Sequence, residues 1–157
     1  MNPYLMISIE LSPRAVQRIV SQIAPGRYDE KTAPERFTAR EQVCHLADWE
    51  PIWLERFEAG LKNPGARIVA YDEGQFAIDG KYAERDIVAE AERYIAGRKR
   101  LADRLRQLRS DDWDITIDHP ERGILTLGDL ANMILGHDMY HVENLTQFLG
   151  EKTAGTW

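Results

Sequence analysis

The sequence predicts an all-α protein, a four-helix bundle with long connections between its second and third and between its third and fourth helices. Four segments place apolar residues at the spacing of one helix face, and each of them opens on a helix start signal. No stretch alternates apolar and polar residues convincingly enough to indicate a strand. At 157 residues the chain has the length of about one domain, so we predict a single domain over residues 1–157.

The first two helices have start signals of different kinds. Ser12 followed by Pro13 is typical of an N-cap and a first helical position, and this helix is expected to run to about Ala24. The second helix is expected to begin at Thr38, which opens a capping box with the glutamate three residues later. It is expected to end near Leu61, before an Asn-Pro-Gly turn.

The third helix is predicted from periodicity, over about Glu84 to Leu108. The fourth is predicted to begin at Thr126, a threonine cap followed by an acidic residue in the first turn, and to run to about Leu149. Pro51 lies in the interior of the second helix, where it lacks an amide donor and is expected to kink the helix.

The two long connections cover about residues 62–83 and 109–125. Both exceed the roughly 2 to 8 residues that usually join the helices of a bundle. They are therefore expected to wrap over the bundle or to carry short extra elements, and loops of this length often shape a site.

The overall charge argues against a nucleic-acid-binding protein. The formal net charge is -6, whereas nucleic acid is bound mainly through clustered lysine and arginine. Basic residues do cluster in the third helix, but their helical spacing and an interleaved aspartate favour a solvated face. This cluster consists of Arg98, Lys99, Arg100, Arg104, Arg106 and Arg109.

The cysteine content and the apolar runs indicate a cytoplasmic protein. Cys44 is the only cysteine in the chain, so an intramolecular disulfide is impossible and a reducing compartment is the simplest setting. The first ten residues lack the basic and apolar regions of a signal peptide. No apolar run approaches the roughly 20 residues of a membrane span, so we expect no contact with a membrane.

The clearest candidate site is the pair His137 and His141. Residues four apart on a helix share one face, so two imidazoles can converge on one ion. Both lie on the apolar stripe of the last helix, where two imidazoles are hard to satisfy by hydrogen bonds alone. A shared metal ion would satisfy both, although such pairs also occur as surface neighbours or as capped core histidines.

His45, in the second helix, is a candidate third ligand. Three neutral imidazoles would leave at least one position of a first-row metal open. However, His45 lies beside the main apolar stripe of its helix, so a surface or interface histidine fits the spacing equally well. Cys44 diverges by about 100° on the helix and is expected to be a small buried hydrophobe. His119 is expected to be a loop residue, and it is a candidate for a position near a cleft between the helices.

Four further residues flank the histidines in sequence. Trp49 and Trp53 are expected to lie in the core. Tyr140 lies on a different face from the two histidines and is a candidate for an interface. Asp138 could orient a neighbouring helix or an imidazole, because metal-bound histidines usually pair their other ring nitrogen with a carboxylate or carbonyl.

Several sequence blocks, in this order, resemble the DinB/YfiT-like superfamily over about residues 36–150. The blocks are Arg40-Glu-Gln-Val-Cys-His-Leu-Ala-Asp-Trp-Glu50, Tyr71-Asp-Glu-Gly-Gln-Phe-Ala77, His119-Pro-Glu-Arg-Gly, and Leu125-Thr-Leu-Gly-Asp-Leu130 leading to His137-Asp-Met-Tyr-His141. The resemblance implies an up-and-down-type four-helix bundle, often a homodimer, with a divalent metal held by His45, His137 and His141. Two residues depart from the pattern, Pro51 within the second helix and Asn144 where a glutamine is frequent.

The superfamily includes thiol S-transferases that use bacillithiol or mycothiol, a maleylpyruvate isomerase, and proteins named as metal-dependent hydrolases. The resemblance therefore implies a metalloenzyme in which Zn²⁺, Ni²⁺ or another first-row dication activates water or a low-molecular-weight thiol. No side chain of the motif is clearly a general base. Two alternatives stay open: a non-catalytic metal-binding or dimeric interaction module, and a protein that binds a partner through aromatic residues of the second helix.

Overall fold

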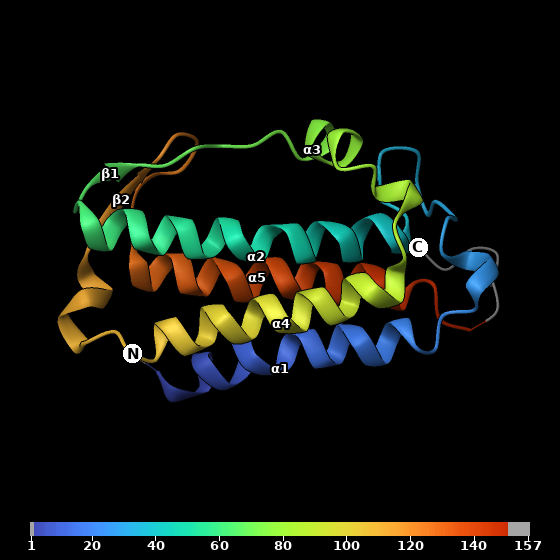
Figure 1. Ribbon diagram of the computed structural model, residues 1–157, viewed down its shortest axis with the longest axis horizontal. Helices are drawn as coiled ribbons and strands as arrows, with labels where there is room; N and C mark the ends of the chain where they lie inside the picture. Colours follow the sequence, from blue (N-terminus) through green and yellow to red (C-terminus); the bar gives the residue numbers. More distant parts are fainter. Residues whose placement is uncertain (1, 151–157) are drawn as a thin grey trace.

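A computed structural model of the chain describes residues 2–150, and it contains four long helices joined by short helices and strands (Figure 1). Residue 1 and residues 151–157 of the predicted domain lie outside the described residues. In chain order the elements are α1 (Pro3–Val20), η1 (Pro25–Arg27), α2 (Ala39–Lys62), β1 (Ala66–Arg67), α3 (Glu73–Asp79), η2 (Tyr82–Glu84), α4 (Ile87–Leu105), η3 (Ser110–Asp114), β2 (Thr116–His119), β3 (Gly123–Thr126) and α5 (Leu127–Thr146).

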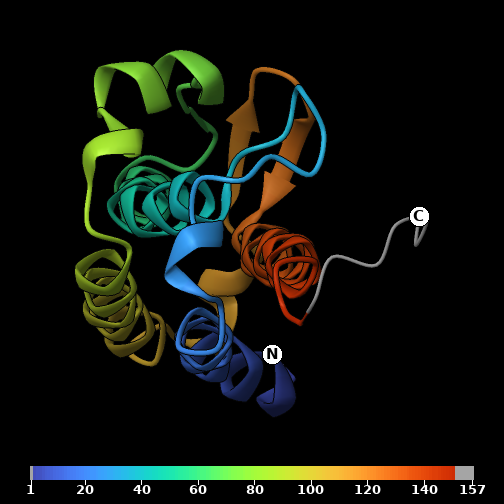
Figure 2. The same cartoon turned by 90° about the vertical axis from the view of Figure 1, so that its right-hand side faces the viewer.

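The long helices form the predicted four-helix bundle, with α1 diagonally opposite α2. Both α1 and α2 pack against α4 and α5, and the end-on view shows the four helices at the corners of the bundle (Figure 2). α2 and α4 run in the same direction, opposite to α1 and α5 (Figure 1). The sequence of helix directions therefore differs from that of a simple up-and-down bundle, because the connection after α2 returns along the whole bundle before α4 begins.

The long connections carry short elements, as expected, and three of these are strands that the sequence pattern did not indicate. β1 pairs in parallel with β2, with Ala66 opposite Ile117, and β2 pairs antiparallel with β3, with Ile117 opposite Leu125. Strands of two and four residues are too short for alternation to be recognised. The sheet joins the two long connections to each other.

Local capping chemistry predicted the starts of α2 and α5 correctly. Thr38 accepts a hydrogen bond from the Glu41 amide at 3.2 Å, and Thr126 forms the corresponding capping box of α5. α4 begins later than predicted, because Asp86 caps it after the separate turn η2. α2 continues as a single helix through the exposed Pro51, so this proline does not interrupt it.

The predicted start of α1 at Ser12 was wrong. Asn2 is the N-cap, accepting from the Tyr4 amide at 3.0 Å, and Pro3 occupies the first helical position. The pair Asn2-Pro3 has the same chemistry as Ser12-Pro13. Pro13 instead lies inside the helix, where its missing N–H leaves the carbonyl four residues earlier without a helical partner.

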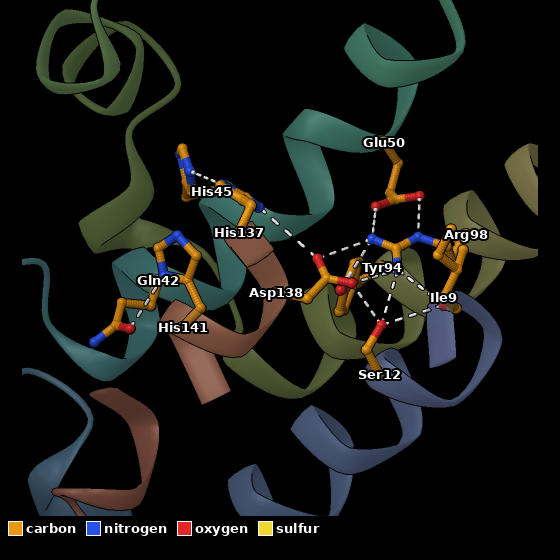
Figure 3. Close-up of polar contacts among 10 residues, drawn as sticks. All are labelled: Ile9, Ser12, Gln42, His45, Glu50, Tyr94, Arg98, His137, Asp138 and His141. Carbon is orange, nitrogen blue, oxygen red and sulfur yellow. Dashed lines mark hydrogen bonds and ion pairs between the residues drawn. The ribbon is translucent and has the colours of Figure 1, made fainter. Parts of the chain in front are cut away.

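The core of the bundle consists of two apolar clusters, one toward each end. Near the boundary between the two clusters, each long helix contributes a buried polar residue: Ser12 of α1, Glu50 of α2, Arg98 of α4 and Asp138 of α5. These four side chains form a buried polar layer across the middle of the bundle (Figure 3). No helix in the described part of the chain is long and apolar enough to cross a membrane.

Arg98 is the centre of the polar layer. Its guanidinium donates to Glu50 Oε1 at 2.7 Å and to Asp138 Oδ1 at 3.0 Å, and Ser12 donates to the same aspartate. Gly97 brings α4 close to Glu50, since a Cβ there would fall 2.7 Å from the Glu50 Cβ. Arg98 also donates at 2.9 Å to the carbonyl of Ile9, which is the group that Pro13 leaves without a helical partner.

The expected solvated basic face needs one correction at its first residue. Lys99, Arg100, Arg106 and Arg109 are exposed, as the prediction requires, whereas Arg98 is only 1% exposed. Periodicity alone could not separate Arg98 from its neighbours, because its place in the core depends on carboxylates from α2 and α5.

The polar layer predicts a specific pH dependence of stability. Burial, together with the neighbouring charge of Asp138, raises the pKa of Glu50 from 4.5 to about 7, although Arg98 opposes this shift. The stability that the protonated Glu50 contributes is therefore fully present below pH 4.5 and is lost as the pH rises through about 7. The loss is at most about 3 kcal/mol. In urea unfolding of the metal-free protein, the free energy of unfolding of the wild type should fall relative to that of Glu50→Gln as the pH rises between these values, because the other titrating groups are common to both proteins. A difference between the two proteins that does not change with pH would contradict the prediction.

Candidate metal centre

Three histidines from two helices converge beside the polar layer (Figure 3). α2 supplies His45, and α5 supplies His137 and His141 one turn apart. The Nε2 atoms of His45 and His137 are 2.9 Å apart, and one ring nitrogen from each of the three lies within 4.8 Å of the others. Spacing left the position of His45 open; the structure places it with the other two, and it is fully buried.

Burial keeps at least two of these imidazoles neutral. It lowers the pKa of His45 to about 2 and that of His141 to about 3, and the neighbouring imidazoles add to both shifts. A neutral imidazole carries one unprotonated nitrogen that can act as a metal ligand. These side chains therefore present ligand atoms, not positive charges, at neutral pH.

Hydrogen bonding alone does not satisfy the cluster. The Nδ1 atoms of His45 and His137 are buried without a hydrogen-bond partner, and each such group costs about 1 to 3 kcal/mol. Imidazole nitrogens in this number and proximity form a donor set that first-row dications bind. The residues therefore fit a divalent metal ion better than they fit a hydrogen-bonded core.

Gln42 and Asp138 support the histidines. His141 Nδ1 lies 3.2 Å from Gln42 Oε1, and an N–H donated there directs the other ring nitrogen toward the cluster. His137 Nδ1 lies 3.8 Å from Asp138 Oδ1. Burial alone would raise the pKa of Asp138, but contacts with His137 and Arg98 outweigh this effect and hold that pKa well below its usual range. Asp138 thus contacts an imidazole, as expected. Gln42 was not among the predicted site residues, although it lies one turn before His45 on α2.

Aromatic side chains enclose the centre. Trp49 and Trp53 are buried, as predicted; the Trp49 ring centre lies 4.2 Å from that of His45, and the Trp53 ring centre lies 5.7 Å from that of His137. Tyr140 is 58% exposed, which agrees with its predicted separate face, yet its ring also contacts His141.

Two cavities open at the histidines, one on each side of Tyr140. The larger, of about 360 Å³, is lined in part by His137 and His119, and the smaller, of about 230 Å³, by His141 and Asn144. His119 ends strand β2 and is buried, so it is a wall of the cavity and not the predicted loop residue. Asn144 donates to the Tyr140 carbonyl at 2.7 Å.

Cys44 takes no part in the cluster. It is fully buried, and its sulfur lies 3.7 Å from the carbonyl oxygen of Tyr82. Burial raises the pKa of its thiol to about 12. The prediction that Cys44 is a small buried hydrophobe is therefore confirmed.

Comparison with known proteins gives matches over most of the chain. The family model described as the DinB superfamily matches residues 8–145. OB0782 of Oceanobacillus iheyensis, which is named provisionally as a metal-dependent hydrolase, is 26% identical over 144 residues, covering 92% of this chain and 83% of that protein.

Two solved structures share the fold. YfiT from Bacillus subtilis, described as a probable metal-dependent hydrolase with an unusual four-helix bundle topology, has a TM-score of 0.87 at 20% identity, over 94% of this chain and 87% of that one. The DinB-like protein YjoA from Bacillus subtilis has a TM-score of 0.62 at 20% identity, over 91% of this chain and 88% of that one. The family match, together with the bundle it shares with YfiT, shows that this chain belongs to the DinB superfamily.

Proposed function

We propose that this protein is a metal-dependent hydrolase whose His45, His137 and His141 hold one divalent first-row ion, Zn²⁺ or Ni²⁺. The observation that carries the proposal is the convergence of three histidine nitrogens within 4.8 Å beside an open cavity. The name given to OB0782 and the description of YfiT favour hydrolysis as the reaction. When bound, a divalent metal supplies Lewis-acid activation of water.

The remaining residues of the centre hold the histidines and shape the space beside them. Gln42 fixes the orientation of His141, and Asp138, itself held by Arg98, lies against His137. Trp49 and Trp53 shield one side of the imidazoles from water. His137 lies on the wall of the cavity of about 360 Å³, a volume suited to a small-molecule substrate.

Gln42 is expected to strengthen metal binding through His141. Replacing it by methionine removes the oxygen that faces His141 Nδ1, and loss of such an outer partner typically costs about 10-fold to 100-fold in metal affinity. Competition with a chromogenic chelator measures the effect. Gln42→Glu retains an acceptor and should bind metal nearly as well as the wild type; equal affinity of Gln42→Met and the wild type would contradict the role.

Hydrolysis is tested with protein loaded with Zn²⁺ or Ni²⁺ against p-nitrophenyl acetate, beside the His141→Ala variant. Turnover that needs the metal and is lost in the variant supports the proposal. A parallel assay follows consumption of a small thiol with a model electrophile. Thiol consumption without hydrolysis would replace the hydrolase by a thiol S-transferase, and bound metal without either activity would favour the non-catalytic metal-binding module.

The homodimer that the resemblance implies stays a prediction. Exposed apolar side chains on α5, Met139 and Tyr140, are 53% and 58% exposed, and they offer a surface for a second copy. Size-exclusion chromatography with light scattering, with and without chelator, gives the oligomeric state and its dependence on metal.

A further inference from the structure

The cavity beside His137 contains a buried arginine that no carboxylate neutralises. Arg56 is 7% exposed, and its guanidinium donates one hydrogen bond, from Nη2 to the Val69 carbonyl at 3.1 Å. Its Nε is buried and lacks a hydrogen-bond partner. Among residues 2–150, the two carboxylates that influence Arg56, those of Glu55 and Glu121, belong to exposed side chains and form no ion pair with it. A buried charge without a partner is costly, so the guanidinium is poised to bind an anion.

Among the residues that the structure describes, those of the inner wall of this cavity carry no negative charge to oppose such an anion. Its other charged side chains, Glu73, Glu121 and Arg122, are exposed and lie at the rim. His119 is buried in the wall, and burial together with the nearby Arg56 lowers its pKa, so it is neutral at pH 7. The rest of the inner wall is mainly aromatic and apolar, formed by Trp49, Trp53, Tyr71 and Met133.

Arg56 is separated from the metal centre by a single aromatic ring. Its guanidinium carbon lies 5.1 Å from the ring centre of Trp53, and the same ring lies 5.7 Å from that of His137. Along α2, Trp49, Trp53 and Arg56 follow His45 at spacings that keep them on one face. A ligand held at Arg56 would therefore extend over Trp53 toward His137.

We propose that Arg56 binds a carboxylate of the substrate, and that the substrates of this protein are small carboxylates with an apolar body. A guanidinium forms strong charge-assisted hydrogen bonds with a carboxylate, and the flanking aromatic rings suit an apolar body. The identification of the ligand as substrate rests on the proposed function, because the metal centre defines the reacting end of the cavity. The binding of a carboxylate at Arg56 does not depend on the proposed function.

A purely structural role for Arg56 makes a different prediction. Val69 belongs to the crossover between α2 and α4, so the hydrogen bond from Arg56 also ties this segment to α2. If this were the whole role of Arg56, replacing it would lower the melting temperature. The wild-type protein would then bind a carboxylate and a neutral molecule of the same shape with equal affinity.

Isothermal titration of the 157-residue chain with benzoate and with benzamide tests the proposal. Benzamide has the shape of benzoate without its charge. Each is titrated into metal-loaded protein and into protein stripped by a chelator. We expect benzoate to bind about tenfold or more tightly than benzamide in both forms. Equal affinities, or no binding of benzoate, would overturn the proposal, and so would a preference confined to the metal-loaded form, since the metal would then be the anion site.

Three variants locate the carboxylate. Arg56→Met should abolish the preference for benzoate and leave benzamide binding within about threefold, while Arg122→Met, at the exposed rim, should leave the preference unchanged. A preference retained in Arg56→Met contradicts the proposal. If Arg56→Met does not fold, Arg56→Gln decides: it removes the charge, keeps a donor that can serve the Val69 carbonyl, and should lose the preference for benzoate, whereas a retained preference would contradict the proposal. A protein that binds no metal but prefers benzoate would refute the metal-dependent hydrolase and leave the anion site standing.

Discussion

Replacing His141 with alanine is expected to abolish stoichiometric binding of a divalent metal. The wild type should hold about one ion per chain after dialysis, because three imidazoles with an open position bind Zn²⁺ or Ni²⁺ firmly. The variant retains His45 and His137, whose Nε2 atoms are 2.9 Å apart, but two ligands do not hold the ion through dialysis. Metal analysis by mass spectrometry should give less than about a tenth of an ion per chain for the variant.

His119→Ala is the matched control for this experiment. His119 is also a buried histidine, and it lines the same cavity as His137, but it lies outside the cluster of three. It should therefore retain the full metal content. Metal in His141→Ala at the wild-type level would refute the centre, as would a wild type that contains no metal and melts at the same temperature with and without chelator.

Arg98→Met is expected to be the most destabilising single substitution in the core. It leaves Glu50 and Asp138 buried without their cation, and it removes the donor to the Ile9 carbonyl. Breaking a buried ion pair by removing one partner costs about 3 to 5 kcal/mol. Urea unfolding followed by circular dichroism should show a loss of this size.

Arg100→Met provides the comparison on the same helix. Arg100 is exposed, so its replacement should change the free energy of unfolding by less than about 0.5 kcal/mol. The triple variant Arg98→Met, Glu50→Gln, Asp138→Asn should recover part of the stability, because the uncompensated charges are gone. A cost below about 1 kcal/mol for Arg98→Met would show that the polar layer does not stabilise the fold.

Local chemistry explains which helix boundaries the sequence predicted. Thr38 and Thr126 carry complete capping boxes, and α2 and α5 begin there. Ser12-Pro13 carries an equally good local signal, but Ser12 donates to Asp138 of α5, a contact that exists only in the folded bundle. The start of α1 at Asn2-Pro3 was therefore missed because tertiary contacts decided between two signals of equal local strength.

The candidate site divides in the same way. The spacing of His137 and His141 on one helix face was enough to pair them, whereas His45 joined them through the family resemblance and then through the packing of α2 on α5. Gln42 and Arg56 had no sequence signal of their own. Each is defined by a group from a distant segment, His141 for Gln42 and the Val69 carbonyl for Arg56.

Anomalous diffraction at the zinc edge, from crystals of the protein loaded with one equivalent of Zn²⁺, tests the metal centre most directly. The three histidine nitrogens that lie within 4.8 Å of one another predict a single strong peak, about 2.0 to 2.1 Å from a ring nitrogen of each of His45, His137 and His141. A peak elsewhere, or one that contacts fewer than all three of these histidines, would contradict the centre proposed for this protein.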